Sequence, residues 1–331
     1  MIGHSMHTRR NKGTVGMLLL LVIILVSGCS SGNNGKANSS NGSNTGNTTN
    51  EASTETSSDT RTVKDAYGDV QVPTNPTKIV VLDIGALDNL LEMGIVPIGA
   101  PSILAAGDPY PKYLKNTDGI KNIGSVNEPN MEAIDALQPD LIIGNKDTHD
   151  AIYKQLGEIA PTVFVETLGT TWKENLKLHS EAVNKQAEGD KLLAAYQQKT
   201  EELKSKIAGK TGTAVSLFRP RADKIQIYMK ATFAGAIMND AGVVRPAAQN
   251  NDEFSKDVTE EQIAELDGDV ILWFDREADA FAKLEKSSLW SSLKGVQNKN
   301  VHSVDWEYWL SGLGIQAATK IVDDLNKFLV K

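Results

Sequence analysis

Arginine is the residue type whose placement points most directly to chemistry in this chain of 331 residues. Lysine outnumbers arginine 27 to 7, yet four of the arginines fall between positions 219 and 276. A guanidinium offers several donors in one plane and binds two oxygens of a carboxylate or hydroxamate together. We therefore expect these four to bind an anionic or oxygen-rich ligand, with a surface ion pair as the alternative for each: Arg219, Arg221, Arg245 and Arg276.

Aromatic residues late in the chain would supply the apolar side of such a site. Trp306, Tyr308 and Trp309 crowd one segment, and Trp273 ends an apolar strand pattern. Ligands bind in crevices at the carboxyl ends of strands in α/β proteins. Alternation along the chain would place Tyr308 on the opposite face from Trp309, so we expect at least one of these rings to be core. Trp309 and Trp273 are the expected cleft residues.

The first half of the chain offers fewer charged candidates, because no arginine occurs between Thr62 and Phe218. The candidates on this side are polar residues after the apolar run Leu141–Gly144 and one tyrosine in the loop Asp108–Pro111. They are Asn145, Lys146, His149 and Tyr110.

Catalytic and direct metal-binding patterns are not evident in the sequence. From residue 61 onward it lacks a G-x-S-x-G motif and a phosphate-binding loop. The histidines that follow residue 28 are His149, His179 and His302, and their wide separation does not match a transition-metal site. We therefore expect a binding protein that is not an enzyme and has no directly bound metal.

The first 28 residues are typical of a signal peptide. A basic stretch with Arg9, Arg10 and Lys12 precedes the uncharged run Met17–Val26, which is too short to span a bilayer. Cys29 is the only cysteine and follows Val-Ser-Gly, a pattern that resembles the bacterial lipobox. We expect Cys29 to carry lipid that anchors the protein.

A polar segment separates Cys29 from the globular part. Residues 30–60 are rich in Asn, Ser, Thr and Gly and should form a disordered tether. Loss of the three cations in residues 1–28 changes the formal charge from −8 to −11. An acidic body argues against nucleic acid as a partner and leaves membrane attachment to the lipid.

Apolar runs in the globular part alternate between strand and helix patterns, which predicts an α/β fold with parallel strands. The helix-to-strand segment Glu132–Ile142 recurs 129 residues later as Glu261–Ile271, with Glu, Ile, Leu, Asp and Ile at matching positions. This echo predicts two similar lobes. Residues 188–207 form a long helical pattern that would join the lobes rigidly and limit their closure on binding. The expected organisation is signal peptide 1–28, lipidated Cys29 and tether 29–60, first lobe 61–171, connecting helices 172–208 and second lobe 209–331.

Taken together, these motifs resemble the helix-linked substrate-binding lipoproteins of ABC importers for iron(III) siderophores. The resemblance rests on the lipobox, the tether, KIVVLDIGALDNLLEMGIVPIGA, PNMEAIDALQPDLIIGN and VTEEQIAELDGDVILW. The segments Val215–Tyr228 and Trp309–Gly314 are similar to the subgroup that binds hydroxamate and citrate-based siderophores. The resemblance implies capture of a ferric siderophore, no cofactor, and delivery to permease subunits driven by a cytoplasmic ATPase.

The family also implies an exposed acid on each lobe that docks to the permease, and Glu132 and Glu261 occupy matching positions of the repeat. Acids in the first turn of a helix are also favoured by the helix dipole, and the two roles are compatible. The family pattern for carboxylate ligands places arginines on both lobes, so the arginine-free first lobe favours a hydroxamate or mixed citrate–hydroxamate ligand.

Haem or cobalamin is the alternative ligand class, because the same fold binds both. Met93, Met131 or His149 would then be the candidate axial ligand. We expect a monomer held at the outer leaflet of the plasma membrane, and the long tether favours a Gram-positive cell.

Overall fold

The computed structural model describes residues 59–209 and 212–330. The predicted signal peptide, the lipidation site Cys29 and the tether up to residue 58 lie outside these residues. Within the described part, no helix has the length and apolar character needed to cross a membrane.

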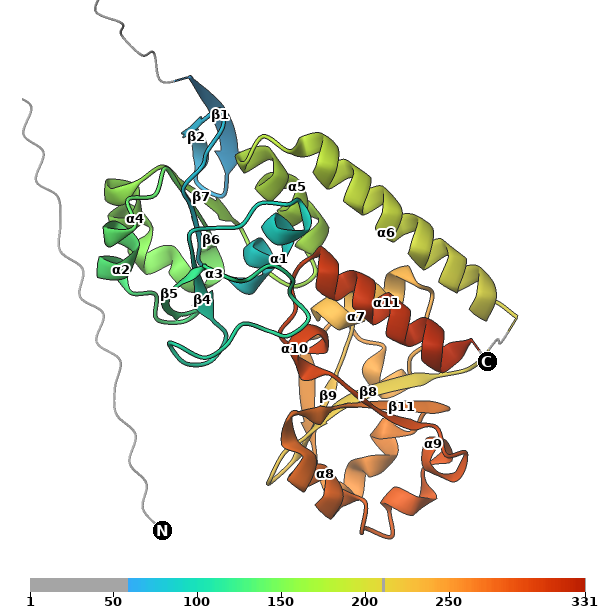
Figure 1. Ribbon diagram of the computed structural model, residues 1–331. Helices are drawn as coiled ribbons and strands as arrows, with labels where there is room; N and C mark the ends of the chain where they lie inside the picture. Colours follow the sequence, from blue (N-terminus) through green and yellow to red (C-terminus); the bar gives the residue numbers. More distant parts are fainter. Residues whose placement is uncertain (1–58, 210–211, 331) are drawn as a thin grey trace, which may run out of the picture. The chain divides into compact units, whose positions relative to one another are not determined.

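The first lobe is a parallel five-stranded sheet, counting the strands in the described residues, and its strand order is β5-β4-β3-β6-β7 (Figure 1). Its strands are apolar because helices cover both faces, as is usual for parallel sheets. An antiparallel hairpin, β1 (Thr60–Asp65) and β2 (Gly68–Pro73), precedes it. The lobe contains β3 (Ile79–Val81), α1 (Ile84–Glu92), β4 (Gly99–Ser102), β5 (Lys121–Ser125), α2 (Met131–Ala136), β6 (Leu141–Asn145), α3 (Lys146–His149), η1 (Asp150–Ile152), α4 (Tyr153–Ile159) and β7 (Thr162–Val165).

The second lobe, in the residues described, has a five-stranded sheet of order β10-β9-β8-β11-β12. Strands β8, β11 and β12 are parallel, as predicted. Strand β9 is antiparallel to β8, because the four residues between them are too few for a crossover and form a hairpin. The lobe contains β8 (Val215–Pro220), β9 (Ile225–Tyr228), α7 (Phe233–Asp240), η2 (Ala247–Gln249), β10 (Ser255–Val258), η3 (Glu260–Leu266), β11 (Val270–Phe274), η4 (Asp275–Glu277), α8 (Ala278–Leu284), η5 (Trp290–Ser292), α9 (Lys294–Gln297), β12 (Val301–Val304), α10 (Trp306–Trp309) and α11 (Ile315–Leu329).

The internal echo corresponds to equivalent positions in the two sheets. Glu132–Ile142 leads into β6 and Glu261–Ile271 leads into β11, and each of these strands is fourth in its sheet. The α/β fold with two similar lobes is therefore confirmed. The second copy differs locally, since its helical turn η3 is a 3-10 helix that begins with a capping box between Thr259 and Gln262.

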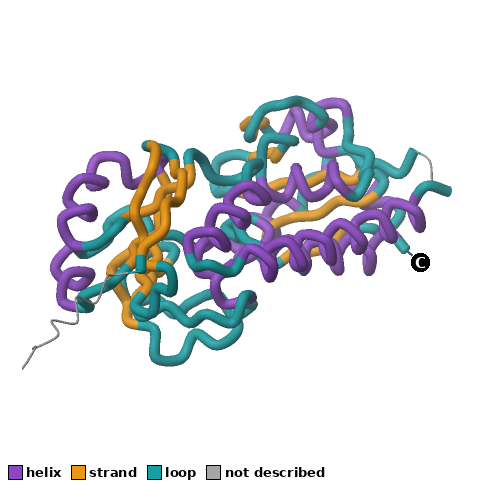
Figure 2. Tube along the Cα trace, turned by 90° about the horizontal axis from the view of Figure 1, so that it is seen from above, coloured by secondary structure: helices purple, strands orange, loops and turns teal. Residues whose placement is uncertain are grey.

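Two helices connect the lobes. Helix α5 (Trp172–Ala182) packs against α1 and β7 of the first lobe, and α6 (Gln186–Ile207) follows it. The 22 residues of α6 form the long helix that the sequence predicts. Figure 2 shows the strands of the two lobes as two groups with helices between them. The C-terminal helix α11 packs along α6 and also contacts α1 and α7, so the lobes share more than one helical connection.

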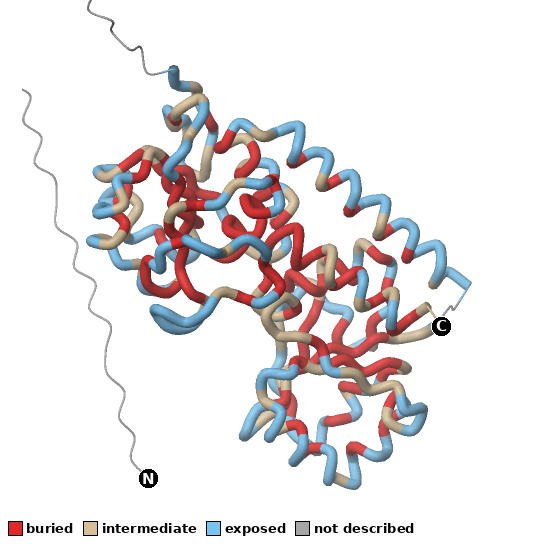
Figure 3. The backbone as a smooth tube through the Cα atoms, in the orientation of Figure 1, coloured by how far each residue is buried: buried red, intermediate tan, exposed pale blue. Residues whose placement is uncertain are grey.

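The largest apolar cluster is continuous across both lobes. It joins the inner faces of the two sheets through α1, α5, α6, α7 and α11, whereas smaller clusters fill the outer faces. Figure 3 shows buried chain running through the strands of both lobes. Trp172 is fully buried in the shared cluster, with its ring 4.7 Å from Tyr196 of α6 and 5.8 Å from Phe233 of α7. This shared core opposes separation of the lobes.

A polar contact between the lobes lies at the amino end of α11. The buried carboxylate of Asp88, in α1, accepts hydrogen bonds from the backbone N–H of Gln316 at 2.7 Å and of Ala317 at 3.1 Å. The neighbouring Asn89 Oδ1 accepts from Ile315 N at 2.9 Å. The first turn of a helix has N–H groups without intrahelical partners, and α1 supplies the acceptors from a distant part of the chain. Gly314 permits this approach, since a Cβ there would lie 2.5 Å from Asp88 Cβ.

Candidate functional site

A cavity of about 330 Å³ lies between the lobes. Asp147 in α3, with Leu168 and Gly169 after β7, lines it on the first-lobe side. On the second-lobe side it is lined by residues at or after the ends of β9 and β11 and around α10. Crevices at the carboxyl ends of strands are the usual ligand sites of α/β folds. The second-lobe lining residues are Tyr228, Ala231, Thr232, Phe233, Ala234, Phe254, Phe274, Trp309, Leu310 and Leu313.

Aromatic rings form much of the second-lobe wall. Tyr228 packs edge-on against Phe274, with ring centroids 5.0 Å apart, and against Phe254 at 5.9 Å. Phe254 is 59 % exposed, although a free phenylalanine ring is normally buried. Trp309, predicted for the cleft, lines the cavity, and its Nε1–H donates to Asp324 at 2.9 Å. The wall can pack against an apolar ligand backbone.

Trp273, also predicted for the cleft, lies on the other face of the sheet. Its ring stacks on Phe281 of α8 with centroids 3.8 Å apart, inside the outer apolar cluster. Register pairs Trp273 with Phe218, whose side chain points to that same outer face. Because neighbours on a strand alternate, Phe274 faces the cavity instead, and the expectation for Trp273 is corrected.

Arg219 lies on the cavity side of β8 and is already paired with a carboxylate. Its Nε donates to both oxygens of Glu277 at 2.9 and 3.0 Å, and Nη2 bonds the same group. This contact raises the pKa of Arg219. Burial raises the pKa of Tyr228, and Arg219 beside its hydroxyl opposes that rise. The Arg219–Glu277 pair therefore adjoins the aromatic wall at Tyr228.

Neither Arg276 nor Arg221 is among the residues that line the cavity. The guanidinium of Arg276 packs over the Trp306 ring, 4.8 Å from its centroid, close to Glu277. Arg221 is exposed in the β8–β9 turn and lines a different hollow with Lys224 and Lys283. The hairpin places Arg221 beyond the end of β8 and outside the residues that line the cavity, although its charge joins that of Arg219 in opposing the rise in the pKa of Tyr228. A role for Arg221 in ligand binding stays a prediction.

Arg245 is a structural residue of the second lobe. It is 8 % exposed, and its Nε donates to Val215 O at 2.8 Å while Nη2 donates to Tyr228 O and Gln249 Oε1 at 2.7 Å. Burial lowers the pKa of Arg245 to about 10, so the group remains charged at neutral pH. Its donors satisfy backbone carbonyls inside the lobe, which leaves them unavailable to a ligand.

Asn145 and His149 are likewise interior residues of the first lobe. Asn145 is fully buried, caps α3 by accepting from Thr148 N, and donates to Asp83 at 3.1 Å. The His149 ring is also buried, and its Nε2 lies 2.9 Å from Val126 O. Both side chains fix the loop that follows β6, and the expectation that they contact ligand is corrected.

Tyr110 and Lys146 have local partners at the surface of the first lobe. The Tyr110 hydroxyl donates to Ala100 O at 3.0 Å. Lys146 Nζ pairs with Glu166 at 2.8 Å and lies 5.2 Å from the centroid of the Tyr67 ring. The salt bridge raises the pKa of Lys146.

Asp147 is the cavity residue of the first lobe that sequence reasoning missed. It is exposed, and its Oδ2 accepts from Leu168 N at 3.1 Å, which joins the loops after β6 and β7. Its place directly after a buried strand was a usable signal, because that edge of the sheet is where ligands bind.

The two candidate docking acids are accessible. Glu132 is exposed in the first turn of α2, and Glu261 is exposed in the first turn of η3. A hydrogen bond from Thr259 lowers the pKa of Glu261.

Direct metal or haem ligation finds little support in the described residues. Across residues 59–209 and 212–330, no cluster of three or more His, Cys, Asp or Glu could hold a metal ion. Met93 is buried in the shared core and Met131 packs against the outer core of the first lobe. With His149 also committed inside the lobe, the three proposed axial ligands lie apart from the residues that line the cavity.

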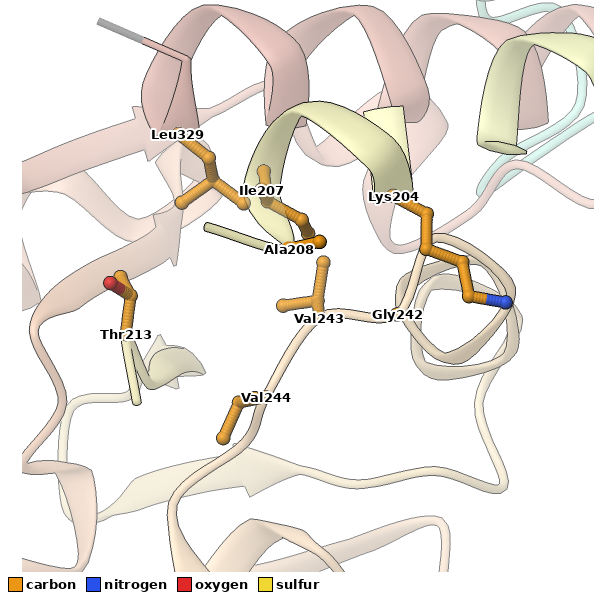
Figure 4. Close-up of a pocket in the computed structure, with 8 residues that line it drawn as sticks. All are labelled: Lys204, Ile207, Ala208, Thr213, Gly242, Val243, Val244 and Leu329. Carbon is orange, nitrogen blue, oxygen red and sulfur yellow. The ribbon is translucent and has the colours of Figure 1, made fainter. Parts of the chain in front are cut away.

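A second cavity, of about 240 Å³, lies at the carboxyl end of α6 (Figure 4). Ile207, Val243, Val244 and Leu329 give it an apolar lining, and Lys204 stands at its edge. It lies away from the carboxyl ends of the strands and has no aromatic wall, so the cavity between the lobes is the better candidate site.

Comparison with known proteins finds similar chains among siderophore-binding and iron-binding proteins. The probable siderophore-binding lipoprotein YfiY of Bacillus subtilis is 40 % identical over 295 residues, which cover 84 % of this chain and 90 % of that one. The Fe(3+)-citrate-binding protein YfmC of the same organism is 30 % identical over 275 residues, covering 82 % and 86 %. The crystal structure of Staphylococcus aureus SirA complexed with staphyloferrin B has a TM-score of 0.72 at 29 % identity, covering 81 % of this chain and 98 % of that one.

A family model described as periplasmic binding protein matches residues 79–308, a range that includes both sheets and α6. Members of that family bind solutes and do not transform them. The chain therefore belongs to the periplasmic binding protein family and is a binding protein, not an enzyme.

Proposed function

We propose that this protein captures a ferric siderophore in the cavity between its lobes and delivers it to an ABC importer. The observation that carries the proposal is the cavity itself, which is lined from both lobes at the carboxyl ends of their strands. Its aromatic wall suits the organic backbone of a chelate, and Arg219 beside Tyr228 can donate to the iron-bound oxygens. The names of YfiY, YfmC and SirA support the same ligand class.

Within that class we infer a hydroxamate or mixed citrate–hydroxamate ligand. The first-lobe wall carries the Asp147 carboxylate, and Arg219 is partly neutralised by Glu277. A polyanionic chelate would meet the Asp147 charge, and the residues that line the cavity include no lysine or arginine to offset it. A chelate of low net charge fits this balance better.

The proposed partners follow from the rest of the chain. We infer that lipid on Cys29 holds the protein, as a monomer, at the outer leaflet of the plasma membrane of a Gram-positive cell, beside its permease and the cytoplasmic ATPase. Exposed Glu132 and Glu261 are proposed to dock the loaded protein through one acid on each lobe.

Ligand titration tests the binding proposal. Tryptophan fluorescence would be followed during addition of a ferric citrate–bis-hydroxamate, a ferric tris-hydroxamate, a ferric tris-catecholate, ferric dicitrate and haemin. Tightest quenching by a hydroxamate-containing chelate is expected. Failure of every ferric chelate to bind, or a Soret band on addition of haemin, would overturn the proposal.

Docking is tested by stimulation of the importer's ATPase activity in proteoliposomes. Charge reversal by Glu132→Arg with Glu261→Arg should abolish stimulation while leaving chelate affinity unchanged. Glu158→Arg, at another exposed acid of the first lobe, serves as the control. Full stimulation by the double variant would refute the docking role.

A further inference from the structure

Glu277 is a carboxylate next to the cavity that sequence reasoning did not consider. It lies in η4, three residues after Phe274, which lines the cavity. The Glu277 carboxylate binds the Arg219 guanidinium through Nε and Nη2, and the two side chains are 27 % and 13 % exposed. The pair is thus shielded from water on most sides, where charge interactions are screened less.

The turn that carries Glu277 is held in place by its neighbours. Asp275 Oδ1 accepts from Trp306 N at 3.0 Å, which ties η4 to α10. Arg276 Nε lies 3.7 Å from Glu277 Oε1, while its guanidinium packs over Trp306. Glu277 therefore lies between two arginines, with its closest bonds to Arg219.

This arrangement affects any oxygen-rich ligand that enters the cavity. Arg219 lies beside the Tyr228 hydroxyl, which donates to Gln226 Oε1 at 2.9 Å, and the Tyr228 ring forms part of the wall. A ligand oxygen that accepts a hydrogen bond from Arg219 must share N–H donors that already bond Glu277. A negatively charged ligand is also repelled by the Glu277 carboxylate. This electrostatic cost increases with the negative charge of the ligand, whereas an uncharged chelate is repelled little.

We propose that Glu277 is a specificity-determining residue that sets the charge preference of the site, by engaging Arg219 and disfavouring polyanionic chelates. This inference rests on the proposed function, because it concerns selection among ferric chelates. Glu277 acts through Arg219 and is a positioning residue for that guanidinium. It accounts for a site with an arginine beside the cavity that still favours ligands of low charge.

The test compares Glu277→Gln with the wild-type protein, using ferric dicitrate as the polyanionic chelate and a ferric tris-hydroxamate as the uncharged one. Glutamine keeps an acceptor for Arg219 and removes the charge. The variant should bind ferric dicitrate about 10 to 100-fold more tightly, the range of a charge-assisted contact, and change tris-hydroxamate affinity by less than about threefold. Raising the salt concentration should reduce the gain for dicitrate.

Asp279→Asn is the matched control, because it removes an equal charge from an exposed position two residues away. It should leave the ratio of the two affinities unchanged. Equal changes for both chelates in Glu277→Gln, or a loss of dicitrate affinity, would overturn the role of Glu277 while leaving the proposed function standing. A wild-type protein that binds no ferric chelate would instead overturn the proposed function and this inference together.

Discussion

Replacement of Asp88 tests how the two lobes are held together. Asp88→Ala removes the acceptor of two buried N–H groups in the first turn of α11, those of Gln316 and Ala317. Each buried donor left without a partner costs about 1–3 kcal/mol, so the free energy of unfolding should fall by about 2–6 kcal/mol. That loss is a large part of the roughly 5–15 kcal/mol typical of a folded domain.

The pH dependence of this loss has a definite sign. Burial raises the pKa of Asp88 to about 7, while the backbone N–H groups of α11 oppose the rise. Between about pH 4 and 7 the folded state then holds a proton that the unfolded state has released, so stability falls as pH rises. From pH 5 to 8 this amounts to about 3 kcal/mol, at about 1.4 kcal/mol per pH unit up to pH 7. The cost of Asp88→Ala should therefore be larger at pH 5 than at pH 8.

Urea unfolding at both pH values, followed by circular dichroism and by tryptophan fluorescence, measures the effect. Coincident transitions by the two probes would justify a two-state treatment. Asp323→Ala is the control on the same helix, because its salt bridge to Lys199 is at the surface and should contribute at most about 1 kcal/mol. A loss below about 1 kcal/mol for Asp88→Ala at pH 5, or the opposite pH trend, would refute this account of the α11 terminus.

Three further predictions concern the same inter-lobe region and the cleft. Burial lowers the pKa of His179 to about 4, so its stabilising contribution is complete above pH 6.5 and is lost as pH falls from 6.5 to 4. In urea titrations, His179→Gln should lose less stability than the wild-type protein over this pH range. An unchanged dependence of stability on pH would contradict this role of His179. Gly314→Ala should destabilise the protein by about 1–3 kcal/mol in thermal melts, because the alanine Cβ would overlap Asp88. An unchanged melting temperature would show that α1 and α11 can move apart. Arg219→Ala should weaken chelate binding about 10 to 100-fold in fluorescence titrations and leave Glu277 with only the longer contact to Arg276. Unchanged affinity would remove Arg219 from the site.

The fold was predictable because its signals are local. Period and length identify a buried strand or an amphipathic helix within about ten residues. The repeat at an offset of 129 residues, from Glu132 to Glu261, then identifies two helix-to-strand units, and these units occupy equivalent places in the two sheets. Even the departure at β9 has a local cause, since a four-residue connection can form only a hairpin.

The site was less predictable, because residue type does not distinguish a group that binds ligand from one that satisfies the interior. Arg245 and Asn145 have the chemistry of ligand contacts, yet their partners are Val215 O and Asp83. Alternation along β11 separates Trp273 from Phe274 but does not say which face meets the other lobe. That assignment depends on helices from elsewhere in the chain.

Glu277 and Asp88 both act through contacts with residues distant in sequence, which a local pattern does not predict. Each acts on a group far away in sequence: Glu277, in η4, on Arg219 in β8, and Asp88 on Gln316 and Ala317 near the end of the chain. In the sequence, Glu277 looks like an ordinary acidic residue of a polar turn, and Asp88 looks like a single polar residue within an apolar helix. Tertiary packing makes Glu277 a counter-ion for Arg219 beside the cavity, and it makes Asp88 the hydrogen-bond acceptor for the first turn of α11. Their carboxylates therefore link ligand selection and lobe cohesion to tertiary contacts that no local pattern encodes.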